Sequence, residues 1–314
     1  MNPEVSVIIV NWNVRDMVLD CIRSVIEQTQ SAHEIIVVDN NSSDGSVDAI
    51  QGEFDSVYVI ANDSNRGFAA ANNQGLEQSQ GNYVLLLNPD TLVLDGAIDK
   101  MLQWIKANPS IGCGGCQVFE SDDIIQKTCF SDPTPLNLLL VETGLQRLSG
   151  SSRFWGKPEY SWWDRRTEMD VDVISGMFML VPRTVLEEVG GMDDAFFVYA
   201  EEADWCRRIR TRGYKCVFTP IAQIIHRDGG SKSTFQIRPK MYVQLQKSQL
   251  IYANKHHGTI GFVKIKLLYL LAMFSRSVIF SVLFVFSRHE RFRINASLAI
   301  QALKFHVLGQ EPSK

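Results

Sequence analysis

Residues 5–10 read VSVIIV, a run of apolar and mostly β-branched side chains interrupted only by Ser6. A run of this kind predicts a strand buried on both faces, as in a parallel sheet. The segments 34–38 (EIIVV) and 83–87 (YVLLL) repeat the pattern, and residues 57–60 predict a shorter strand. These four segments are expected to form the centre of one sheet.

Helical segments alternate with the predicted strands. Residues 14–28 carry apolar side chains at helical spacing, residues 68–78 are rich in alanine, and residues 97–107 end before Asn108 and Pro109. This alternation predicts an α/β fold with a mostly parallel, Rossmann-like sheet covered by helices on both faces.

Polar side chains follow the predicted strands at their carboxyl ends. Asn11 and Asn13 follow the first strand, Asp39 the second and Asp90 the fourth. Ligands of open α/β sheets bind beyond the carboxyl ends of the strands. We therefore expect these side chains to meet in one binding crevice.

The common phosphate-binding loops are absent from this crevice. The first strand is followed by Asn11-Trp12-Asn13, without the glycines of a dinucleotide-binding or P-loop motif. A nucleotide held without such a loop needs another counter-charge, most simply a divalent cation on its phosphates. Asp90 is a candidate ligand because Mg²⁺ and Mn²⁺ favour carboxylate oxygens. The sequence Asn-Pro-Asp is equally compatible with an ordinary turn.

Charge is distributed unevenly along the 314 residues. Residues 1–237 hold 19 Lys and Arg against 33 Asp and Glu, a net charge of −14, whereas residues 238–314 hold 12 against two, a net charge of +10. Within the basic part, sixteen of the twenty residues 267–286 are apolar or aromatic. A basic segment this apolar argues against nucleic acid as a partner and for an anionic membrane surface.

The start of the chain and its cysteines indicate a cytoplasmic protein. Residues 1–4 lead directly into the first strand, with no signal-peptide pattern, and the six cysteines are scattered through apolar stretches. Cys113 and Cys116 form a C-x-x-C. No second pair follows at zinc spacing, so we interpret them as small packed side chains and not as a metal or redox site.

Five aromatic side chains crowd between Gly150 and Asp164. Aromatic rings stack on sugars and anchor at lipid interfaces, and they also pack loops against sheets. This cluster therefore has two possible roles, a functional lid or core packing. It comprises Phe154, Trp155, Tyr160, Trp162 and Trp163.

Several motifs together resemble a known family. The chain resembles family-2 glycosyltransferases of the GT-A fold in four segments: VSVIIVNWN (5–13), EIIVVDNNSSDGS (34–46), NRGFAAANNQG (65–75) and YVLLLNPDT (83–91). It is similar to the bacterial rhamnosyltransferase-like branch of that family in three later segments: VISGMFMLVPR (173–183), GGMDDAFFVYAEEADWCRRIR (190–210) and HRDGGSKS (226–233). The resemblance implies a nucleotide-diphospho-sugar donor, a divalent metal and inversion at the anomeric carbon.

The resemblance also assigns donor-binding residues. Asp39 resembles the carboxylate that binds the base, Arg66 would lie near the diphosphate, and Asp90 keeps the metal-binding position of the D-x-D motif while Asn88 replaces its first acid. The metal, Mg²⁺ or Mn²⁺, is assigned to Asp90 with His226. The full donor set is Asn11, Asp39, Asp44, Arg66, Gly67, Asn73, Asn88 and Asp90.

The catalytic base is expected among the acids 201–204. Inversion requires a base that takes the acceptor hydroxyl proton during attack. In the family, the second member of an acidic pair is the usual base, which corresponds to Glu202, with Glu201 and Asp204 as further candidates. Asp204 is also spaced for an ion pair with Arg208. By the same resemblance, the acceptor and sugar floor comprises Asp172, Ser175 and Gly176.

These interpretations predict an inverting, metal-dependent glycosyltransferase that moves a sugar to a lipid-linked glycan in cell-surface polysaccharide synthesis. The resemblance to the rhamnosyltransferase-like branch implies that the sugar is L-rhamnose and that its donor is dTDP-rhamnose. Residues 1–110 would bind the nucleotide sugar, residues 111–237 would hold the catalytic and acceptor site, and residues 238–314 would form a helical tail. Two alternatives remain. A nucleotidylyltransferase would normally carry a glycine-rich loop after the first strand, and a non-catalytic sugar-nucleotide-binding protein is supported only by Asn88.

The tail is expected at the cytoplasmic surface of the membrane. Residues 267–286 would form a helix of ~30 Å, long enough to span a bilayer core. Arg276 at its midpoint would cost at least ~2.5 kcal/mol there. A helix lying in the interface, or a shallow hairpin bent at residues 275–277, lets Arg276 snorkel and its basic flanks meet anionic headgroups. Packing on the catalytic domain, an oligomer interface and a true span are the alternatives.

Overall fold

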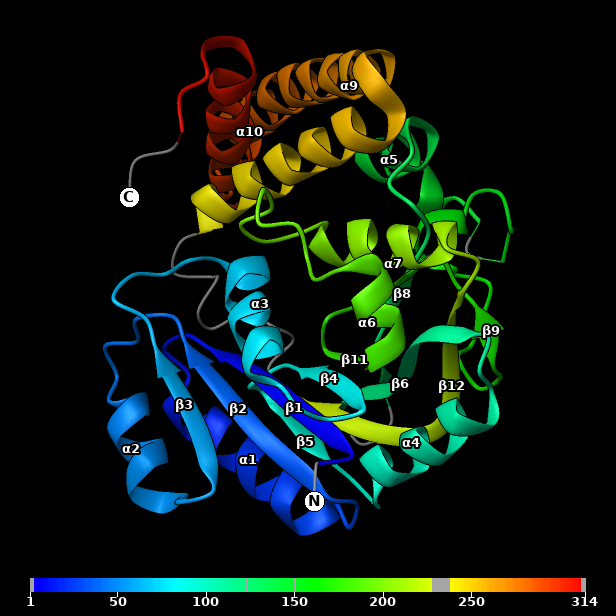
Figure 1. The fold of residues 1–314 in the computed structure, drawn as a ribbon. Coiled ribbons are helices and arrows are strands. Elements are labelled where there is room, and N and C mark those ends of the chain that lie inside the picture. Colours follow the sequence, from blue (N-terminus) through cyan, green and yellow to red (C-terminus); the bar gives the residue numbers. More distant parts are fainter. Residues whose placement is uncertain (1–2, 122–123, 150, 228–237, 312–314) are drawn as a thin grey trace.

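The structure, a computed structural model, describes residues 3–121, 124–149, 151–227 and 238–311. Its centre is one large sheet with the strand order β3-β2-β1-β4-β11-β6-β12-β5 (Figure 1). The strands β1 (Val5–Asn11), β2 (His33–Asp39), β3 (Val57–Ala61) and β4 (Tyr83–Leu87) are parallel. Every residue of β1 is buried, as expected for a strand covered on both faces.

Helices cover both faces of this sheet (Figure 1). One face packs against α1 (Arg15–Gln28) and α4 (Ala97–Ala107), and the opposite face packs against α3 (Phe68–Gln78). The apolar stripe of α1 is fully buried at Val18, Ile22 and Val25. The alternation predicted from the sequence is therefore confirmed in the first half of the chain.

The second half makes the sheet mixed. The strand β11 (Phe178–Pro182) lies antiparallel between β4 and β6 (Ile111–Ser121). The strand β12 (Lys215–His226) runs parallel to β6 and antiparallel to β5 (Thr91–Val93). The remaining elements are α2 (Ser46–Glu53), β7 (Ile124–Ile125), β8 (Cys129–Phe130), α5 (Pro135–Thr143), η1 (Leu145–Arg147), η2 (Lys157–Glu159), β9 (Met169–Asp170), β10 (Val173–Ile174), α6 (Arg183–Val189) and α7 (Glu201–Thr211).

The C-x-x-C pair lies within β6. Cys113 packs in the core on one face of the sheet and Cys116 in the core on the other face, because residues three apart in a strand point to opposite sides. Both thiols are buried and free. The two sulfurs therefore cannot bind one metal together, in agreement with the packing interpretation.

The tail consists of α9 (Arg238–Ser287) and α10 (Glu290–Leu308), which fold back on each other above the central sheet (Figure 1). The path of α9 is broken at Gly258, whose φ of 64° and ψ of −170° are not helical. By length and composition, one stretch within residues 239–287 is apolar enough to cross a membrane, and only 17% of it is buried.

Two expectations for Arg276 are wrong. The chain does not bend at residues 275–277, since α9 continues through them to Ser287. The guanidinium does not snorkel, because it forms an ion pair of 2.8 Å with Glu142 of α5 and donates to the hydroxyl of Tyr242 at 3.0 Å. These partners, 134 and 34 residues earlier in the chain, satisfy the arginine inside the tail–α5 junction.

Candidate active site

A cavity of about 950 Å³ opens at the carboxyl ends of β1 and β4. It extends from the sheet to α5 and the beginning of α9. Eight of the predicted site residues line it, from five separate parts of the chain: Gly67, Asn88, Asp90, Ser175, Gly176, Glu201, Glu202 and His226. The remaining predicted residues, Asn11, Asp39, Asp44, Arg66, Asn73, Asp172 and Asp204, are not among its lining residues.

Asn11 and Asp39 lie side by side at the ends of β1 and β2, where they are register partners. The amide of Asn11 donates to one oxygen of Asp39 at 2.7 Å, and the backbone N–H of Ser42 donates to the other at 2.8 Å. Both side chains are buried. They border the cavity through their neighbours Val10 and Asn40, which line it.

Asp44 and Asn73 hold loops together. Asp44 accepts from the backbone N–H groups of Arg15 and Ser46. Partial burial alone would raise the pKa of Asp44, but the hydrogen bonds from Ser46 and Arg15 outweigh it and lower the pKa. Asn73 of α3 donates to Met192 and accepts from its backbone N–H. Both residues therefore fix loops in this structure and do not face the cavity.

The loop before α3 touches the loop before α7. Gly67 has a φ of 86°, and a Cβ atom there would lie 2.3 Å from the carbonyl oxygen of Phe197. Only glycine permits this approach without displacing backbone. The backbone N–H of Phe68 donates to the same oxygen. The neighbouring side chain of Arg66 is exposed.

Asp90 and His226 converge on the cavity from the ends of β4 and β12. Asp90 Oδ1 and His226 Nε2 lie 3.0 Å apart, yet their geometry is not that of a hydrogen bond, and both atoms are buried without a partner. The second ring nitrogen of His226, which is fully buried, is also without a partner. Buried polar atoms normally have partners, so this pair fits a divalent cation. Among the described residues, no further potential protein ligand joins this pair to make a group of three.

Glu201 and Glu202 begin α7 and face the cavity together. Burial raises the pKa of both carboxyl groups, and the neighbouring charge of Glu202 raises the pKa of Glu201 further. Glu202 Oε1 accepts from the backbone N–H of Gly176 at 3.2 Å. A Cβ atom on Gly176 would lie 3.1 Å from that oxygen, so glycine makes room for the carboxylate.

The chain enters α7 in a strained conformation. Tyr199 and Ala200 have φ values of 72° and 68°, which are unfavourable for residues other than glycine, asparagine and aspartate. Both residues line the cavity. Such strain is concentrated at functional sites. The two residues aim the first turn of α7, and with it the acidic pair, at the cavity.

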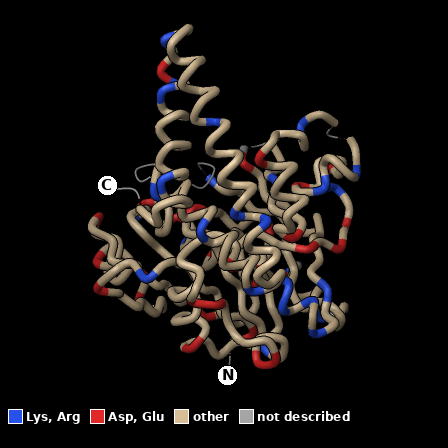
Figure 2. The backbone as a smooth tube through the Cα atoms, turned by 90° about the horizontal axis from the view of Figure 1, so that it is seen from above, with Lys and Arg blue, Asp and Glu red and all other residues tan. Residues whose placement is uncertain are grey.

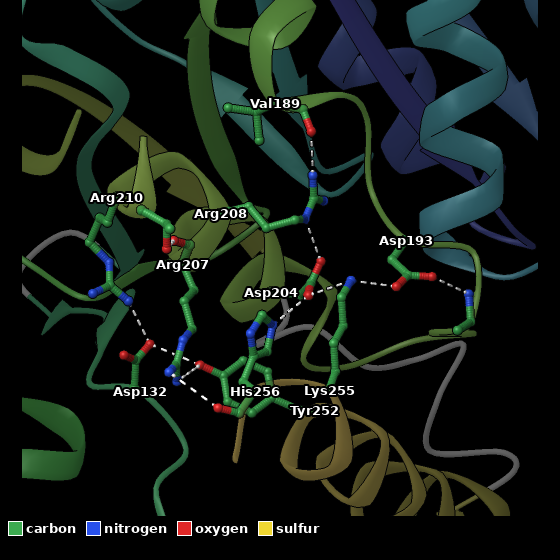
Figure 3. Close-up of polar contacts among 12 residues, drawn as sticks. Asp132, Val189, Asp193, Asp204, Arg207, Arg208, Arg210, Tyr252, Lys255 and His256 are labelled. Atoms are coloured by element: carbon green, nitrogen blue, oxygen red, sulfur yellow. Dashed lines mark hydrogen bonds and ion pairs between the residues drawn. The ribbon is translucent and has the colours of Figure 1, made fainter. Parts of the chain in front are cut away.

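The structure corrects the assignment of Asp204 as a candidate base. Asp204 is fully buried and lies outside the cavity lining, where it binds Arg208, Lys255 and His256 at 2.7–2.8 Å (Figure 3). Burial alone would raise its pKa, but the hydrogen bonds from His256, Lys255 and Arg208 outweigh it and hold the pKa well below its ordinary value. Asp204 therefore attaches the tail to the catalytic domain.

Asp172 belongs to a second set of contacts near the tail. It lies 3.6 Å from the guanidinium of Arg210, which also binds Asp132 at 2.6 Å. Asp132 in turn accepts from the hydroxyl of Tyr252 on α9 (Figure 3). Of the predicted acceptor floor, Ser175 and Gly176 line the cavity, whereas Asp172 supports the wall behind it.

Sequence reasoning missed several residues that line the cavity. Their common signal is proximity to a recognised motif, as for the group Trp12, Asn40, Asn65, Phe68, Tyr199 and Ala200. No local motif marks the lining residues of the tail, which are Lys240, Met241, Leu245 and Gln249. The last motif continues beyond His226 into residues 228–233, which lie outside the described part of the chain.

The aromatic cluster divides between two roles. Tyr160 and Trp163 are buried, and the ring of Trp163 packs edge-on against Phe218 with centroids 4.8 Å apart. Phe154 is 54% exposed and contacts Trp155. None of the five aromatic residues lines the cavity, although the neighbouring Pro158 and Glu159 do. Core packing therefore accounts for Tyr160 and Trp163.

The sequence matches one family over most of the catalytic part. The model of glycosyl transferase family 2 covers residues 6–190, more than half of the chain. The chain belongs to glycosyl transferase family 2. The resemblance read from the motifs is confirmed.

Two relatives of this family-2 glycosyltransferase match over most of their own length. An N-acetylglucosaminyl-diphospho-decaprenol L-rhamnosyltransferase of Mycobacterium tuberculosis is 25% identical over 247 residues, covering 73% of this chain and 78% of the relative. The low-salt glycan biosynthesis hexosyltransferase Agl10 of Haloferax volcanii is 24% identical over 250 residues, covering 78% of this chain and 74% of the relative.

Solved structures identify the fold of this glycosyltransferase. Mannosyltransferase PcManGT from Pyrobaculum calidifontis, in complex with GDP-Man and Mn²⁺, matches with a TM-score of 0.56 and 16% identity over 99% of this chain and 89% of its own. GalNAc-T7 with UDP, GalNAc and Mn²⁺ matches with a TM-score of 0.55 and 16% identity over 82% of this chain and 51% of its own. The GT-A fold predicted from the motifs is confirmed.

Proposed function

We propose that this family-2 glycosyltransferase moves a sugar, with inversion, from a nucleotide-diphospho-sugar to a lipid-linked glycan in cell-surface polysaccharide synthesis. One observation carries the proposal: a single cavity is lined by the Asp90–His226 pair and by the Glu201–Glu202 pair. The first pair suits the diphosphate leaving group, and the second suits proton removal from an acceptor.

Asp90 and His226 are the residues that would hold Mg²⁺ or Mn²⁺. A bound ion of this kind neutralises the charge that develops on the leaving diphosphate. The unpartnered oxygen Oδ1 of Asp90 and the adjacent Nε2 of His226 would provide the ligand atoms. Asn88, which replaces the first acid of the motif, lines the cavity next to them as a neutral contact for ribose or water.

Glu202 is the proposed base. Its carboxylate, held by the N–H of Gly176, would take the proton of the acceptor hydroxyl as that oxygen attacks the anomeric carbon. The raised pKa makes Glu202 a stronger base than an exposed glutamate. Glu201 is the more deeply buried of the two, whereas the hydrogen bond from Gly176 favours the ionised form of Glu202.

We propose dTDP-L-rhamnose as the donor because the motifs resemble those of rhamnosyltransferases and because the mycobacterial relative is named as one. The proposed acceptor, a lipid-linked glycan, rests on the name of the same relative. The family match argues against the nucleotidylyltransferase alternative, and the buried acidic pair argues against a protein that only binds the nucleotide. The division into residues 1–110, 111–237 and 238–314 stays a prediction, and its second boundary falls within residues outside the described part.

The donor assignment is tested by thermal denaturation with a panel of nucleotide sugars, each with and without Mn²⁺. We expect dTDP-L-rhamnose with Mn²⁺ to raise Tm the most, because ligand binding to the folded state stabilises it by mass action. A larger rise with a UDP- or GDP-sugar would move the donor assignment. No rise with any nucleotide sugar would contradict the transferase proposal.

The tail is proposed to hold the enzyme at the cytoplasmic surface of the membrane. In Figure 2 the hairpin of α9 and α10 stands out from the body, and most of its length is uncharged. Exposed apolar patches of this extent mark contact surfaces. The large apolar residues of α9 that are more than half exposed are Ile260, Leu267, Leu271, Phe274, Ile279, Val285 and Phe286. Arg288 and Arg291 at the hairpin tip could meet anionic headgroups.

Flotation with liposomes tests this location. Binding of the full chain should rise with anionic lipid and fall in high salt, since part of the attraction is electrostatic. Replacing Phe286 with glutamate should weaken binding severalfold. Tyr58→Glu, which alters a 55% exposed side chain on the distant strand β3, is the control. A full-length protein that ignores liposomes and forms a defined oligomer would assign the apolar face to a protein interface.

A further inference from the structure

The cavity has a second wing that the donor does not explain. Beyond Glu201 and Glu202 it continues between α5 and the first turns of α9. The volume of about 950 Å³ therefore includes this wing as well as the part of the cavity beside Asp90 and His226.

Both walls of this wing are mainly apolar. Leu138 and Val141 of α5 face Met241 and Leu245 of α9 across it. The spacing of four residues places Met241, Leu245 and Gln249 on one face of α9. Phe130, Pro133, Val173 and Val198 add further apolar lining to the cavity.

The helix α5 leaves several apolar side chains exposed. Its sequence PLNLLLVET buries Leu138 and Leu140, but leaves Leu136, Leu139 and Val141 between 37% and 49% exposed. Leu138 packs with the apolar cluster of the tail. Exposed apolar side chains that lie together normally mark a contact surface. The uncovered side of α5 is therefore continuous with the wing and with the exposed apolar face of the tail.

The α9 wall is held firmly against the catalytic domain. The hydroxyl of Ser248 donates to the carbonyl of Val198 at 2.8 Å, next to the acidic pair. Tyr252 binds Asp132, and Lys255 and His256 bind Asp204 (Figure 3). The wing therefore has two fixed walls, one from α5 and one from the tail helix α9.

Lys240 is the one lysine or arginine among the described residues that line the cavity. It stands at the α9 side of the wing, whereas the donor diphosphate is assigned to the metal pair. A cation at the edge of an apolar channel suits a ligand that carries both an anionic group and a long apolar chain.

We propose that this wing, lined by Leu138, Val141, Met241 and Leu245, binds the apolar chain of a diphosphate-linked lipid acceptor, with Lys240 at the acceptor diphosphate. The inference rests on the proposed transfer to a lipid-linked glycan and adds the place where the lipid lies. The chain would leave the wing along α5 towards the apolar face of the tail, while the sugar end points to Glu202.

The test uses farnesyl diphosphate, which has the apolar chain and the diphosphate without any sugar. Its binding to the full-length enzyme is measured by isothermal titration calorimetry without divalent cations, so that the diphosphate is not drawn to Asp90 and His226. Inorganic diphosphate should bind at least tenfold more weakly than farnesyl diphosphate. Leu245→Glu and Val141→Glu should each raise Kd for farnesyl diphosphate at least tenfold, and Lys240→Ala severalfold.

The matched control is Leu271→Glu, on the same helix but outside the cavity and 68% exposed. It should leave the Kd unchanged, and stabilisation by the nucleotide sugar should persist in every variant. The inference would be overturned if the wild type does not bind, if both wing variants bind with the Kd of the wild type, or if Leu271→Glu loses as much affinity as they do. Failure of the donor panel would instead defeat the proposed function while leaving this binding result in place.

Discussion

Replacing Glu202 with glutamine should lower kcat by roughly 10²–10⁴-fold, the usual contribution of a general base. Glutamine keeps the size of the side chain and can still accept from Gly176, but it cannot take the acceptor proton. Donor affinity, measured by thermal shift with the nucleotide sugar and Mn²⁺, should stay close to that of the wild type. Glu187→Gln, at an exposed position of α6, should retain full activity.

The pH dependence gives a second readout for the same residue. Burial raises the pKa of Glu202, so the base loses its charge at a higher pH than an exposed glutamate. Activity should be present above this raised pKa and fall as the pH drops through it. The residual rate of Glu202→Gln should lack this acid limb. If Glu201→Gln is the more damaging change and Glu202→Gln keeps the limb, the base is Glu201.

Replacing Asp90 with alanine should remove the metal-dependent part of donor affinity and lower kcat/KM at least ~100-fold. Metal stabilisation of a leaving group is worth several kcal/mol, and about 1.4 kcal/mol corresponds to a factor of ten. Titration of Mn²⁺ against wild type and variant, with rates and donor Kd measured at each concentration, checks this expectation.

The control for this change is Asp55→Ala, which removes an exposed acid before β3 and should behave as the wild type. His226→Gln should weaken Mn²⁺ binding less than Asp90→Ala, because it removes a neutral ligand and no charge. Full activity in excess EDTA would contradict the metal assignment. A near-normal rate for Asp90→Ala at low Mn²⁺ would contradict the role of Asp90 in particular.

The sequence by itself determined the elements whose cause is local. Two-sided burial of β1, β2 and β4 appears as continuous apolar runs, and the stripe of α1 appears as helical spacing. The sequence predicts Asp90 in the cavity because this residue follows a strand of the parallel sheet, and ligands bind beyond the carboxyl ends of such strands. Glu202 could be found only through its motif, since acids in the first turn of a helix are common and carry no catalytic signal of their own.

Tertiary structure decided everything that depends on distant partners. The direction of β11 depends on which strands it joins, and its apolar run is the same either way. The role of Asp204 is set by Lys255 and His256, about fifty residues later in the chain. The partner of Arg276 is Glu142, which lies 134 residues earlier in the chain. Such pairings leave no periodic pattern in the sequence, because a side chain carries no mark of which remote segment will cover it.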